Sequence, residues 1–567
     1  MVFISGLALT IVGFLITKEM GWIFSILTIA AFCIVVHFHN KLLMGIKRYY
    51  AYLKIKYENL ARMNIDWENI PLPIINTPSE EQSLGKDLDL FGTRSLHHLT
   101  DVSISFEGSG RLRKWISNYS PDSNIISKRQ NIIKELTGQT RFRDKFLLKA
   151  HLISKKALHG EKILEWISKS SNEEIPKWLL PVSAILIIVY LTLFILHIAG
   201  LMGSSWFAVF LIYFFLYSSY QKRIGKIVEE SAELENQIKK FSILITYVEK
   251  FPFSNLPNLK KFLEPLVENN ASAKLKKLQK VITALLAREN PIVRLIVNIF
   301  FPYDIFFGRK LVSLKTEVEI NIPLWLEKLN ELECYLSLSN FAYSNPDYIF
   351  PEIELKEKKI FETKFTGHPL IKRNKKICND FSFNKENEIL IITGSNMSGK
   401  STFLKTIGIN LCLAYAGAPV NAGLFRTSLY ELFTCIKVND SVADGISYFY
   451  AEVKRLKELL DEFENEKHLQ MFFLIDEIFK GTNNKERLTG SRAYIKKLSE
   501  LKGTGAVTTH DLELVNLANE ISTITNYHFR EDIEGNKMVF DYKIHKGPCP
   551  TTNALKIMEL AGLPVSE

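Results

Sequence analysis

Residues 389–404 read ILIITGSNMSGKSTFL: an apolar run, a glycine-rich turn and then Gly-Lys-Ser-Thr. Residues 394–401 match the pattern G-x-x-x-x-G-K-[ST], which binds phosphates through backbone N–H groups when a strand precedes it and a helix follows. The apolar run predicts a buried strand, and the apolar spacing after Lys400 predicts a helix whose N-terminus faces the loop. The alternative is a glycine-rich turn that occurs by chance. Such a turn would not need a strand before it and a helix after it, and the sequence predicts both. The sequence therefore predicts a P-loop for a nucleoside triphosphate.

The predicted nucleotide-binding residues are those of the loop and of the first helical turn. They are Gly394, Ser395, Asn396, Met397, Ser398, Gly399, Lys400, Ser401 and Thr402. The Lys400 ammonium would reach the β and γ phosphates. The Ser401 hydroxyl would be a ligand of Mg²⁺.

Two further strand ends carry polar side chains that fit the same chemistry. Residues 471–477, MFFLIDE, predict a buried strand that ends in Asp476, which would hold Mg²⁺ through water, and Glu477, which would polarise the attacking water. A third strand at 505–509 ends at His510, which would sense or position the γ-phosphate. The alternatives are a surface Asp-Glu pair and a capping histidine. The order of the three motifs favours catalytic roles for Glu477 and His510 and a metal-ligand role for Ser401 and Asp476.

These motifs together resemble the ATPase domain of the MutS DNA mismatch-repair family. TGSNMSGKST resembles that family's TGPNMGGKST, DEIFKGTNNKE resembles its DEIGRGTST, and VTTHD resembles its ATHY. The similarity runs from about residue 366 to the C-terminus. It implies an α/β P-loop ATPase domain of the ABC or MutS type that uses ATP and Mg²⁺.

The resemblance also implies a dimer. Residues 440–449, DSVADGISYF, resemble the family's DDLASGRSTF, whose serine completes the site of the neighbouring subunit, and that position is Ser447 here. Two family positions near the adenine fall on Lys376 and Tyr542, of which Tyr542 is the better stacking candidate. Residues 547–564 resemble a further family stretch. We therefore expect a homodimer through the ATPase domains.

Four apolar runs, at 1–17, 22–38, 179–198 and 201–217, predict four transmembrane helices in two hairpins. Basic residues flank them on one side, at Lys41, Lys47, Arg48, Lys177, Lys222, Arg223 and Lys226. The positive-inside rule then places both termini and all large segments in the cytoplasm, as in a multi-pass inner-membrane protein. A signal peptide for the first run, or a buried soluble hairpin for either pair, is the alternative.

The rest of the chain predicts helices and one linker. Residues 46–63 are basic and aromatic, residues 69–81 are a proline-rich linker, and residues 89–136 resemble the helical core of the MutS family. Helical periodicity is plain at 227–287 and 323–342, whereas 292–307 fits a buried or interfacial helix better than a fifth span. The expected domains are hairpin 1 at 1–39, juxtamembrane helix and linker at 40–82, helical core at 83–176, hairpin 2 at 177–220, second core part at 221–350 and ATPase at 351–567.

The formal net charge is +10, from 71 Lys and Arg against 61 Asp and Glu, which suits an anionic membrane face or nucleic acid. The six cysteines show no metal or disulfide spacing and indicate a reducing compartment.

The family's mismatch readers carry an N-terminal wedge domain, for which the first ~80 residues leave no room. We therefore expect any DNA binding to be weak and not mismatch-specific. A membrane-bound ATP-driven switch that does not act on DNA remains open. An ABC-type transporter subunit is disfavoured because no L-S-G-G-Q stretch is present.

Overall fold

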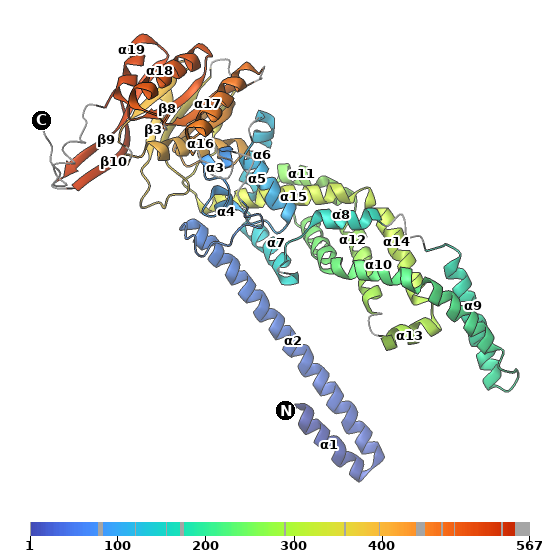
Figure 1. The fold of residues 1–567 in the computed structure, drawn as a ribbon. Helices are drawn as coiled ribbons and strands as arrows, with labels where there is room; N and C mark the ends of the chain where they lie inside the picture. The colour runs from blue at the N-terminus through green and yellow to red at the C-terminus, as the bar shows by residue number, and fades with distance from the viewer. Residues whose placement is uncertain are drawn as a thin grey trace.

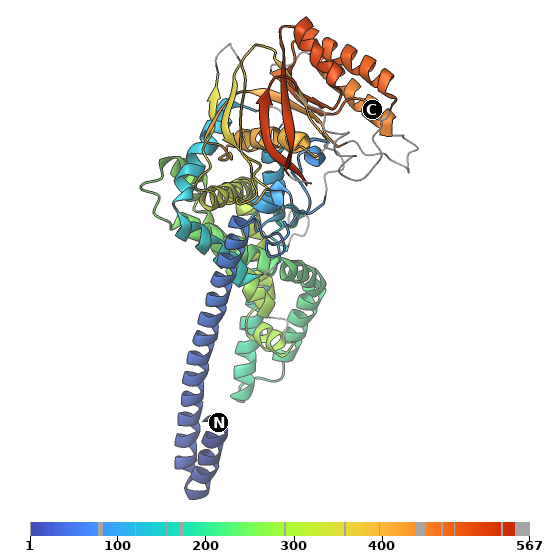
Figure 2. The same ribbon diagram turned by 90° about the vertical axis from the view of Figure 1, so that its left-hand side faces the viewer.

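The computed structural model describes residues 2–77, 83–118, 121–154, 156–169, 175–287, 291–355, 359–395, 397–437, 448–465, 469–480, 482–534 and 537–549. The molecule is elongated, with an α/β domain at one end, a helical body in the middle and two long apolar arms (Figure 1). A view turned by 90° shows that both arms point away from the α/β domain (Figure 2).

A six-stranded sheet forms the centre of the α/β domain. Its strand order is β10-β9-β4-β8-β7-β6, and only the β9–β10 pair is antiparallel. Central strands of a parallel sheet are covered on both faces, so the unbroken apolar runs of β4 and β7 fit this position. The strands are β4 (Ile389–Thr393), β6 (Tyr430–Cys435), β7 (Gln470–Asp476), β8 (Thr504–Thr509), β9 (Ile524–Glu534) and β10 (Lys537–Lys546).

Helices and a second sheet complete this domain. The helices are α16 (Lys400–Ala416), α17 (Tyr448–Glu464), α18 (Asn484–Glu500), η3 (Leu512–Asn516) and α19 (Leu517–Glu520). The second sheet has the order β1-β5-β2-β3 and is made of β1 (Glu352–Glu354), β2 (Phe361–Thr366), β3 (Asn379–Phe383) and β5 (Leu424–Ser428).

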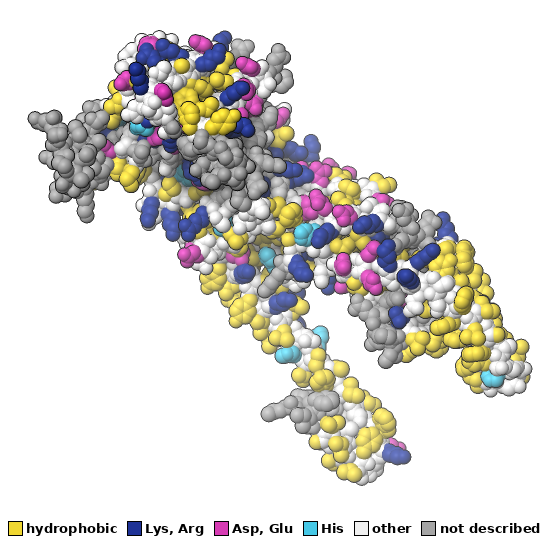
Figure 3. Space-filling model, viewed as in Figure 1, with side chains coloured by type: hydrophobic (Ala, Val, Ile, Leu, Met, Phe, Trp, Pro, Cys, Tyr) yellow, Lys and Arg dark blue, Asp and Glu magenta, His cyan; other side chains and the backbone are white. Residues whose placement is uncertain are grey.

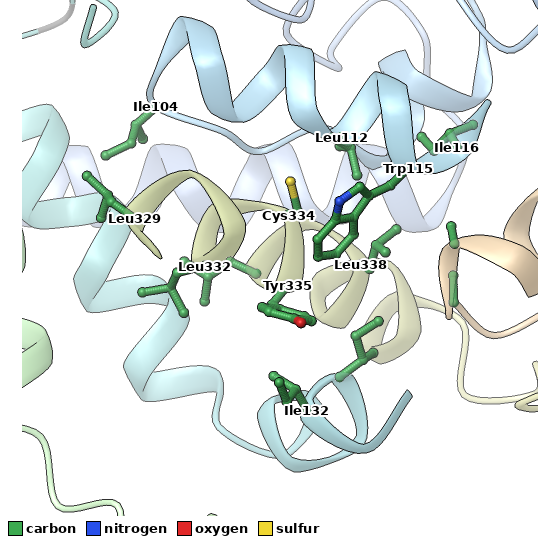
Figure 4. Packing of buried hydrophobic residues seen from close by; sticks show 14 of the residues in the cluster. Ile104, Leu112, Trp115, Ile116, Ile132, Leu329, Leu332, Cys334, Tyr335 and Leu338 are labelled. Atoms are coloured by element: carbon green, nitrogen blue, oxygen red, sulfur yellow. The ribbon is translucent and has the colours of Figure 1, made fainter. Parts of the chain in front are cut away.

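Helix α15 (Ile322–Ser344) is the centre of the helical body and leads directly into the α/β domain. It is buried along most of its length, because its apolar residues face α5 (Phe106–Ile116) on one side and α6 (Ser123–Thr137) on another. Figure 4 shows Tyr335 of α15 between Trp115 and Ile132, and the rings of Trp115 and Tyr335 meet edge to face at 5.1 Å.

The other helices of the body surround this centre. They are α3 (Ser83–Asp87), α4 (Leu96–Thr100), α7 (Thr140–Ile153), α8 (Gly160–Ser168), α11 (Pro257–Glu268), α12 (Ala271–Leu286) and α14 (Tyr303–Glu319). The adjacent histidines His97 and His98 are buried in α4 and bond to backbone carbonyls, which makes them packing residues.

Each arm is a helical hairpin. The first joins α1 (Val2–Ile16) to the start of α2 (Lys18–Met63), and the second joins α9 (Leu179–Ile198) to the start of α10 (Trp206–Glu249). Hydrophobic side chains cover the described surface near the tips of both arms (Figure 3). The far ends of α2 and α10 enter the helical body, so each arm is continuous with a core helix. The predicted boundary at residue 39 falls inside α2.

The prediction of four transmembrane helices is wrong. Among the described residues, two helices are long and apolar enough to cross a membrane, Lys18–Met63 and Leu179–Ile198. Helix α1 has 15 residues, about 22 Å, which is short of the ~30 Å hydrocarbon core. The fourth run fails because its first five residues lie in a turn, and α10 becomes polar soon after Tyr217. The apolar runs in the sequence are longer than the apolar helical segments that they form in the fold.

The apolar stretch at 292–307 is not one helix. Helix α13 (Pro291–Phe300) ends just before Pro302, and α14 starts at Tyr303. Proline lacks the N–H that a continuing helix needs, so the chain turns here. Leu295, Ile296 and Phe300 of α13 are exposed.

Candidate nucleotide site

The three polar strand ends predicted to act together do meet in the fold. Strand β8 lies between β4 and β7, and all three are parallel, so their carboxyl ends share one edge of the sheet. The loop after β4 carries Lys400, β7 ends at Asp476, and His510 follows β8. Crevices at the carboxyl ends of parallel strands are the usual ligand sites of α/β sheets.

The loop after β4 depends on glycine at two positions. Gly394 has φ 145° and Gly399 has φ 105°, conformations that side chains disfavour. A Cβ atom on Gly394 would lie 2.8 Å from the carbonyl oxygen of Phe529, and one on Gly399 would lie 3.2 Å from the Tyr542 ring. Gly399 is also the N-cap of α16 and supplies no side-chain acceptor to the helix. The first N–H groups of α16 therefore remain open to an anion.

The Lys400 side chain folds back into this loop. Its ammonium donates hydrogen bonds to the carbonyl oxygens of Gly394, at 2.6 Å, and Ser395, at 2.8 Å, and only 3% of the residue is exposed. Burial lowers the pKa of Lys400, and the nearby carboxylates of Glu477 and Asp476 oppose that effect. A buried ammonium inside a glycine loop fits a phosphate group.

Ser401 and Asp476, the two metal ligands that the sequence predicts, are in direct contact. The Ser401 hydroxyl donates to Asp476 Oδ2 at 2.6 Å. Thr508, which the sequence analysis did not single out, donates to Asp476 Oδ1 at 2.5 Å and thereby orients the carboxylate. A hydroxyl beside a carboxylate is an oxygen donor set that suits Mg²⁺.

Glu477 lies just past the end of β7 in a left-handed backbone conformation, with φ 58°. The pKa of its carboxyl group is lowered to about 2, first by the His510 imidazole and then by the Lys480 and Lys400 ammonium groups. His510 Nδ1 is 3.7 Å from Glu477 Oε1, and Lys480 Nζ is 3.3 Å from Oε2. Glu477 is therefore an anion at neutral pH, and its Oε1 lies 4.0 Å from the Lys400 ammonium of the glycine loop.

An ion pair next to His510 was not predicted from the sequence. Arg487 of α18 donates two hydrogen bonds, both at 2.8 Å, to the two carboxylate oxygens of Asp511. This bidentate pair fixes the chain next to His510 against α18. Its sequence signal is weak, since Arg487 and Asp511 are 24 residues apart.

Tyr542 lies beside the phosphate loop because β10 has a bulge there. The register with β9 shifts between Phe540 and Ile544, and Tyr542 has φ 52°. Asn379 of β3 fixes the bulge by donating to the Tyr542 carbonyl oxygen at 3.0 Å and accepting from the Ile544 N–H at 2.9 Å.

A cavity of about 270 Å³ opens between Tyr542 and α16. Its lining residues include Thr366, Ile377, Asn379, Thr402, Phe529 and Tyr542. Lys376 does not line this cavity. Its ammonium bonds to Asn421 Oδ1 at 2.9 Å and lies over the Tyr348 ring, so the neighbouring Ile377 faces the cavity instead.

Other predicted residues lie as follows. Met397 is exposed, while Ser398 is buried and its hydroxyl donates to the Ser395 carbonyl oxygen at 2.8 Å. The Ser395 hydroxyl is buried and, among the described atoms, has no hydrogen-bond partner, which leaves it available to a phosphate. Asn396 and Ser447 lie outside the described residues, as does most of 440–449.

Comparisons with known proteins place this site in context. Residues 390–566 match the family MutS domain V. The DNA mismatch repair protein MutS of Fusobacterium nucleatum is 27% identical over 260 residues, which cover 44% of this chain and 28% of that protein. The proteins of the same name from Clostridium kluyveri and Geobacillus kaustophilus are 30% and 27% identical over 245 and 276 residues. These cover 42% and 47% of this chain.

The chain thus spans less than a third of the length of these curated relatives, 27% and 30% in the last two cases. The matched part contains the phosphate loop, the Asp476–Glu477 pair and His510. Residues 390–566, the C-terminal third of the chain, are similar to MutS domain V, and the curated relatives match 42–47% of the chain, which supports the MutS family for this part of the molecule.

Proposed function

We propose that this protein is a MutS-like ATPase that binds ATP with Mg²⁺ and hydrolyses it. The observation that carries the proposal is the convergence at one sheet edge of a buried Lys400 in a glycine loop, a Ser401–Asp476 pair 2.6 Å apart and an ionised Glu477. No single one of these features specifies the reaction, but together they supply phosphate binding, metal binding and a group to orient water.

Each side chain then has a definite role. Lys400 and the N–H groups at the start of α16 bind the phosphates. Ser401 and Asp476 hold Mg²⁺, which would neutralise charge on the phosphates. Glu477 orients the attacking water and His510 contacts the γ-phosphate end. Because the pKa of Glu477 is near 2, it acts as a fixed negative charge that accepts a hydrogen bond from water more than as a strong base.

The cavity beside Tyr542 is the proposed adenine pocket. It adjoins the phosphate loop through Gly399 and Thr402, and the Tyr542 ring offers a face for stacking. Apolar walls with a few polar groups are typical of such pockets.

The direct test of this proposal is phosphate release from ATP by the purified full chain, with and without Mg²⁺. We expect turnover that requires the metal and that saturates with ATP. Absence of ATP binding in the intact protein would reject the proposal.

We further propose that two copies close on each other through their ATPase domains, with Ser447 of each acting on the γ-phosphate of the other. The support is the resemblance of residues 440–449 to the family segment. A mixture of Ser447→Ala and Lys400→Ala proteins should regain one competent site per heterodimer. If the mixture is no more active than the two variants apart, the shared site is wrong.

The two apolar arms are the proposed membrane anchor. Only 6% and 22% of the most apolar stretches of α2 and α9 are buried, so these stretches do not pack inside the protein core. Cationic residues such as Lys47, Arg48 and Lys222 lie toward the body ends of the arms, and this distribution supports a cytoplasmic ATPase domain at the inner membrane. The full chain should stay in the membrane fraction after an alkaline wash, and a reporter after Glu567 should read cytoplasmic. Release by the wash would contradict the anchor.

The relatives are named for mismatch repair, and we propose a DNA role without mismatch specificity. Contact with phosphates needs only basic surface, which the formal net charge of +10 favours, whereas sensing a mispair needs an additional wedge and clamp. Binding should therefore be steeply salt-dependent and equal for paired and mismatched duplexes. A tenfold preference for a mismatch, about 1.4 kcal/mol, would contradict this.

A second candidate is an ATP-driven membrane switch that does not act on DNA. The continuity of α2 and α10 from arm tip to helical body favours it, because motion at the ATPase would reach the membrane through rigid helices. Absence of binding to duplex, branched and single-stranded DNA at low salt would select this function.

A further inference from the structure

A second cationic site lies in the helical body, far in sequence from the phosphate loop, and two of its cations, Arg62 and Lys240, are buried. It is a cavity of about 250 Å³ where α2, α7, α10 and the 71–74 segment meet. Helix α7 contacts both α2 and α10, the helices that continue into the two arms (Figure 1). Four cationic side chains line it, Lys54, Arg62, Lys156 and Lys240, against two carboxylates, Glu58 and Asp101.

Arg62 is the first reason to assign a ligand here. Only 7% of it is exposed, and its Nη2 donates to the Asp101 carbonyl oxygen at 2.7 Å. Its Nε is buried and has no hydrogen-bond partner among the described atoms. A buried guanidinium that lacks a bonded carboxylate is costly, since the desolvation of the charge is only partly repaid by carbonyl dipoles.

Lys240 is the second reason. It is 3% exposed, and its ammonium donates to the Lys156 carbonyl oxygen at 2.6 Å. Burial lowers the pKa of Lys240, and it lowers the pKa of His151 as well, with Lys240 and Lys54 adding to the effect on His151. The Glu333 carboxylate opposes the lowering of the Lys240 pKa, and four cations against two carboxylates leave the cavity lining with an excess of positive charge.

The two lining carboxylates have partners other than Arg62 and Lys240. Asp101 accepts a hydrogen bond from the Ser109 hydroxyl at 2.6 Å and from the Ser103 N–H at 2.9 Å. Glu58 lies 3.6 Å from Lys54 and so offsets the charge of that lining cation, while Arg62 and Lys240 keep theirs. Neither carboxylate forms a hydrogen bond to the Arg62 guanidinium or the Lys240 ammonium among the described contacts.

We propose that this cavity binds a small soluble anion that carries phosphate, held by Arg62 and Lys240. Guanidinium and ammonium groups together are the usual partners of phosphate oxygens. The volume equals that of roughly eight water molecules in the liquid, which leaves room for a diphosphate group with some of its water. Such an anion would join residues of α2 to Lys240 of α10 and so stiffen the bases of both arms.

A free anion fits the position better than a lipid headgroup. Lys47 is among the first cations after the apolar part of α2, and Arg62 follows it by 15 residues, about 22 Å along the helix. The cavity therefore lies well beyond the headgroup level that Lys47 marks.

The test is titration calorimetry of the full chain with inorganic pyrophosphate in neutral-lipid nanodiscs, at 0.15 M salt without Mg²⁺. The chain should carry Lys400→Ala, so that the phosphate loop does not bind the probe. We expect one site, weakened at least tenfold by Lys240→Met, a change of similar length that removes the charge. Lys145→Met on the exposed side of α7 is the matched control and should bind like the parent chain.

Thermal unfolding guards against loss of fold. Pyrophosphate should raise the Tm of the parent chain and of Lys145→Met but not that of Lys240→Met, while all three unfold cooperatively. Equal binding by the parent and Lys240→Met, or no binding by the parent at millimolar pyrophosphate, overturns the proposal. Displacement of pyrophosphate in nanodiscs that contain phosphatidic acid would identify a lipid phosphate as the occupant and overturn the soluble anion.

Discussion

Lys400 and Lys240 are alike as isolated side chains. Each is 3% exposed, each donates to backbone carbonyl oxygens, and burial is the largest cause of the lowered pKa of each. Their surroundings differ. Lys400 follows a glycine loop and has Glu477 at 4.0 Å, whereas Lys240 lies toward the C-terminal end of α10 among residues from five other segments: α2, α7, 71–74, 101–104 and 156–157.

This difference determines whether an anion site can be recognised from the sequence or only from the structure. A phosphate loop is local, so eight consecutive residues of the sequence reveal it. A cavity built from distant helices has no motif, and only burial without a bonded carboxylate reveals it. Substitutions in the phosphate loop and in the helical cavity should therefore have different effects on ATP binding.

Lys400→Ala should have the largest effect. Removing the ammonium from the phosphate loop should weaken ATP binding roughly 10³-fold, since a buried charge-assisted contact is lost. Equilibrium binding of a fluorescent ATP analogue measures this. Lys497→Ala, on the exposed face of α18, is the control and should bind normally. A similar loss of ATP affinity in Lys240→Met would contradict separate roles for the two lysines.

Glu477→Gln should reduce ATP turnover by about 10²-fold while nucleotide affinity changes little. The reason is that the carboxylate meets the water and not the bound phosphates, so kcat falls and binding remains. Steady-state phosphate release gives kcat, and a parallel binding titration gives the nucleotide affinity. Glu500→Gln, an exposed carboxylate on the same domain, should leave both unchanged. Unaltered kcat in Glu477→Gln would remove this residue from the reaction.

Tyr542→Ala should weaken ATP binding about tenfold, because it removes one stacking face worth ~1.4 kcal/mol. Tyr542→Phe keeps the ring and should bind like the parent chain. Comparison with GTP sharpens the result, since loss of a stacking face affects both bases. Equal affinity of the alanine and phenylalanine variants would place the base elsewhere.

The smallest expected effect is a pH dependence of stability. The folded pKa of Glu477, about 2, lies below the ordinary 4.5, so its ionised form stabilises the fold above about pH 4.5 and this contribution is lost as the pH falls toward 2. The parent chain should be more stable than Glu477→Gln by about 1 kcal/mol at pH 7, since solvent reduces the full effect. Thermal unfolding at pH 7, 5 and 3 should show the difference shrinking. A constant difference would assign it to packing.

The sequence predicted the nucleotide end well, because each part is local. An apolar run before a glycine loop forms β4, and the runs before Asp476 and His510 form β7 and β8. The helices at 227–287 and 323–342 are likewise confirmed by α10, α11, α12 and α15.

One prediction failed for a reason that lies beyond local pattern. Four apolar runs became two spanning-length helices, because residues 201–205 at the start of the fourth run lie in a turn and α1 is short. The sequence also could not show that Ile377, and not Lys376, lines the cavity beside Tyr542, because that depends on which residue faces the cavity.

The sequence by itself determined the phosphate loop, the acidic strand end and the apolar arms, because each follows from the chemistry of neighbouring residues. The tertiary structure alone decided which side chains contact these residues. Thr508 orients Asp476, Arg487 braces Asp511, and Asn379 fixes the bulge that places Tyr542. It also brought Arg62 and Lys240 to one cavity. These contacts join residues far apart in the chain, and only the packing of whole helices and strands sets their distance.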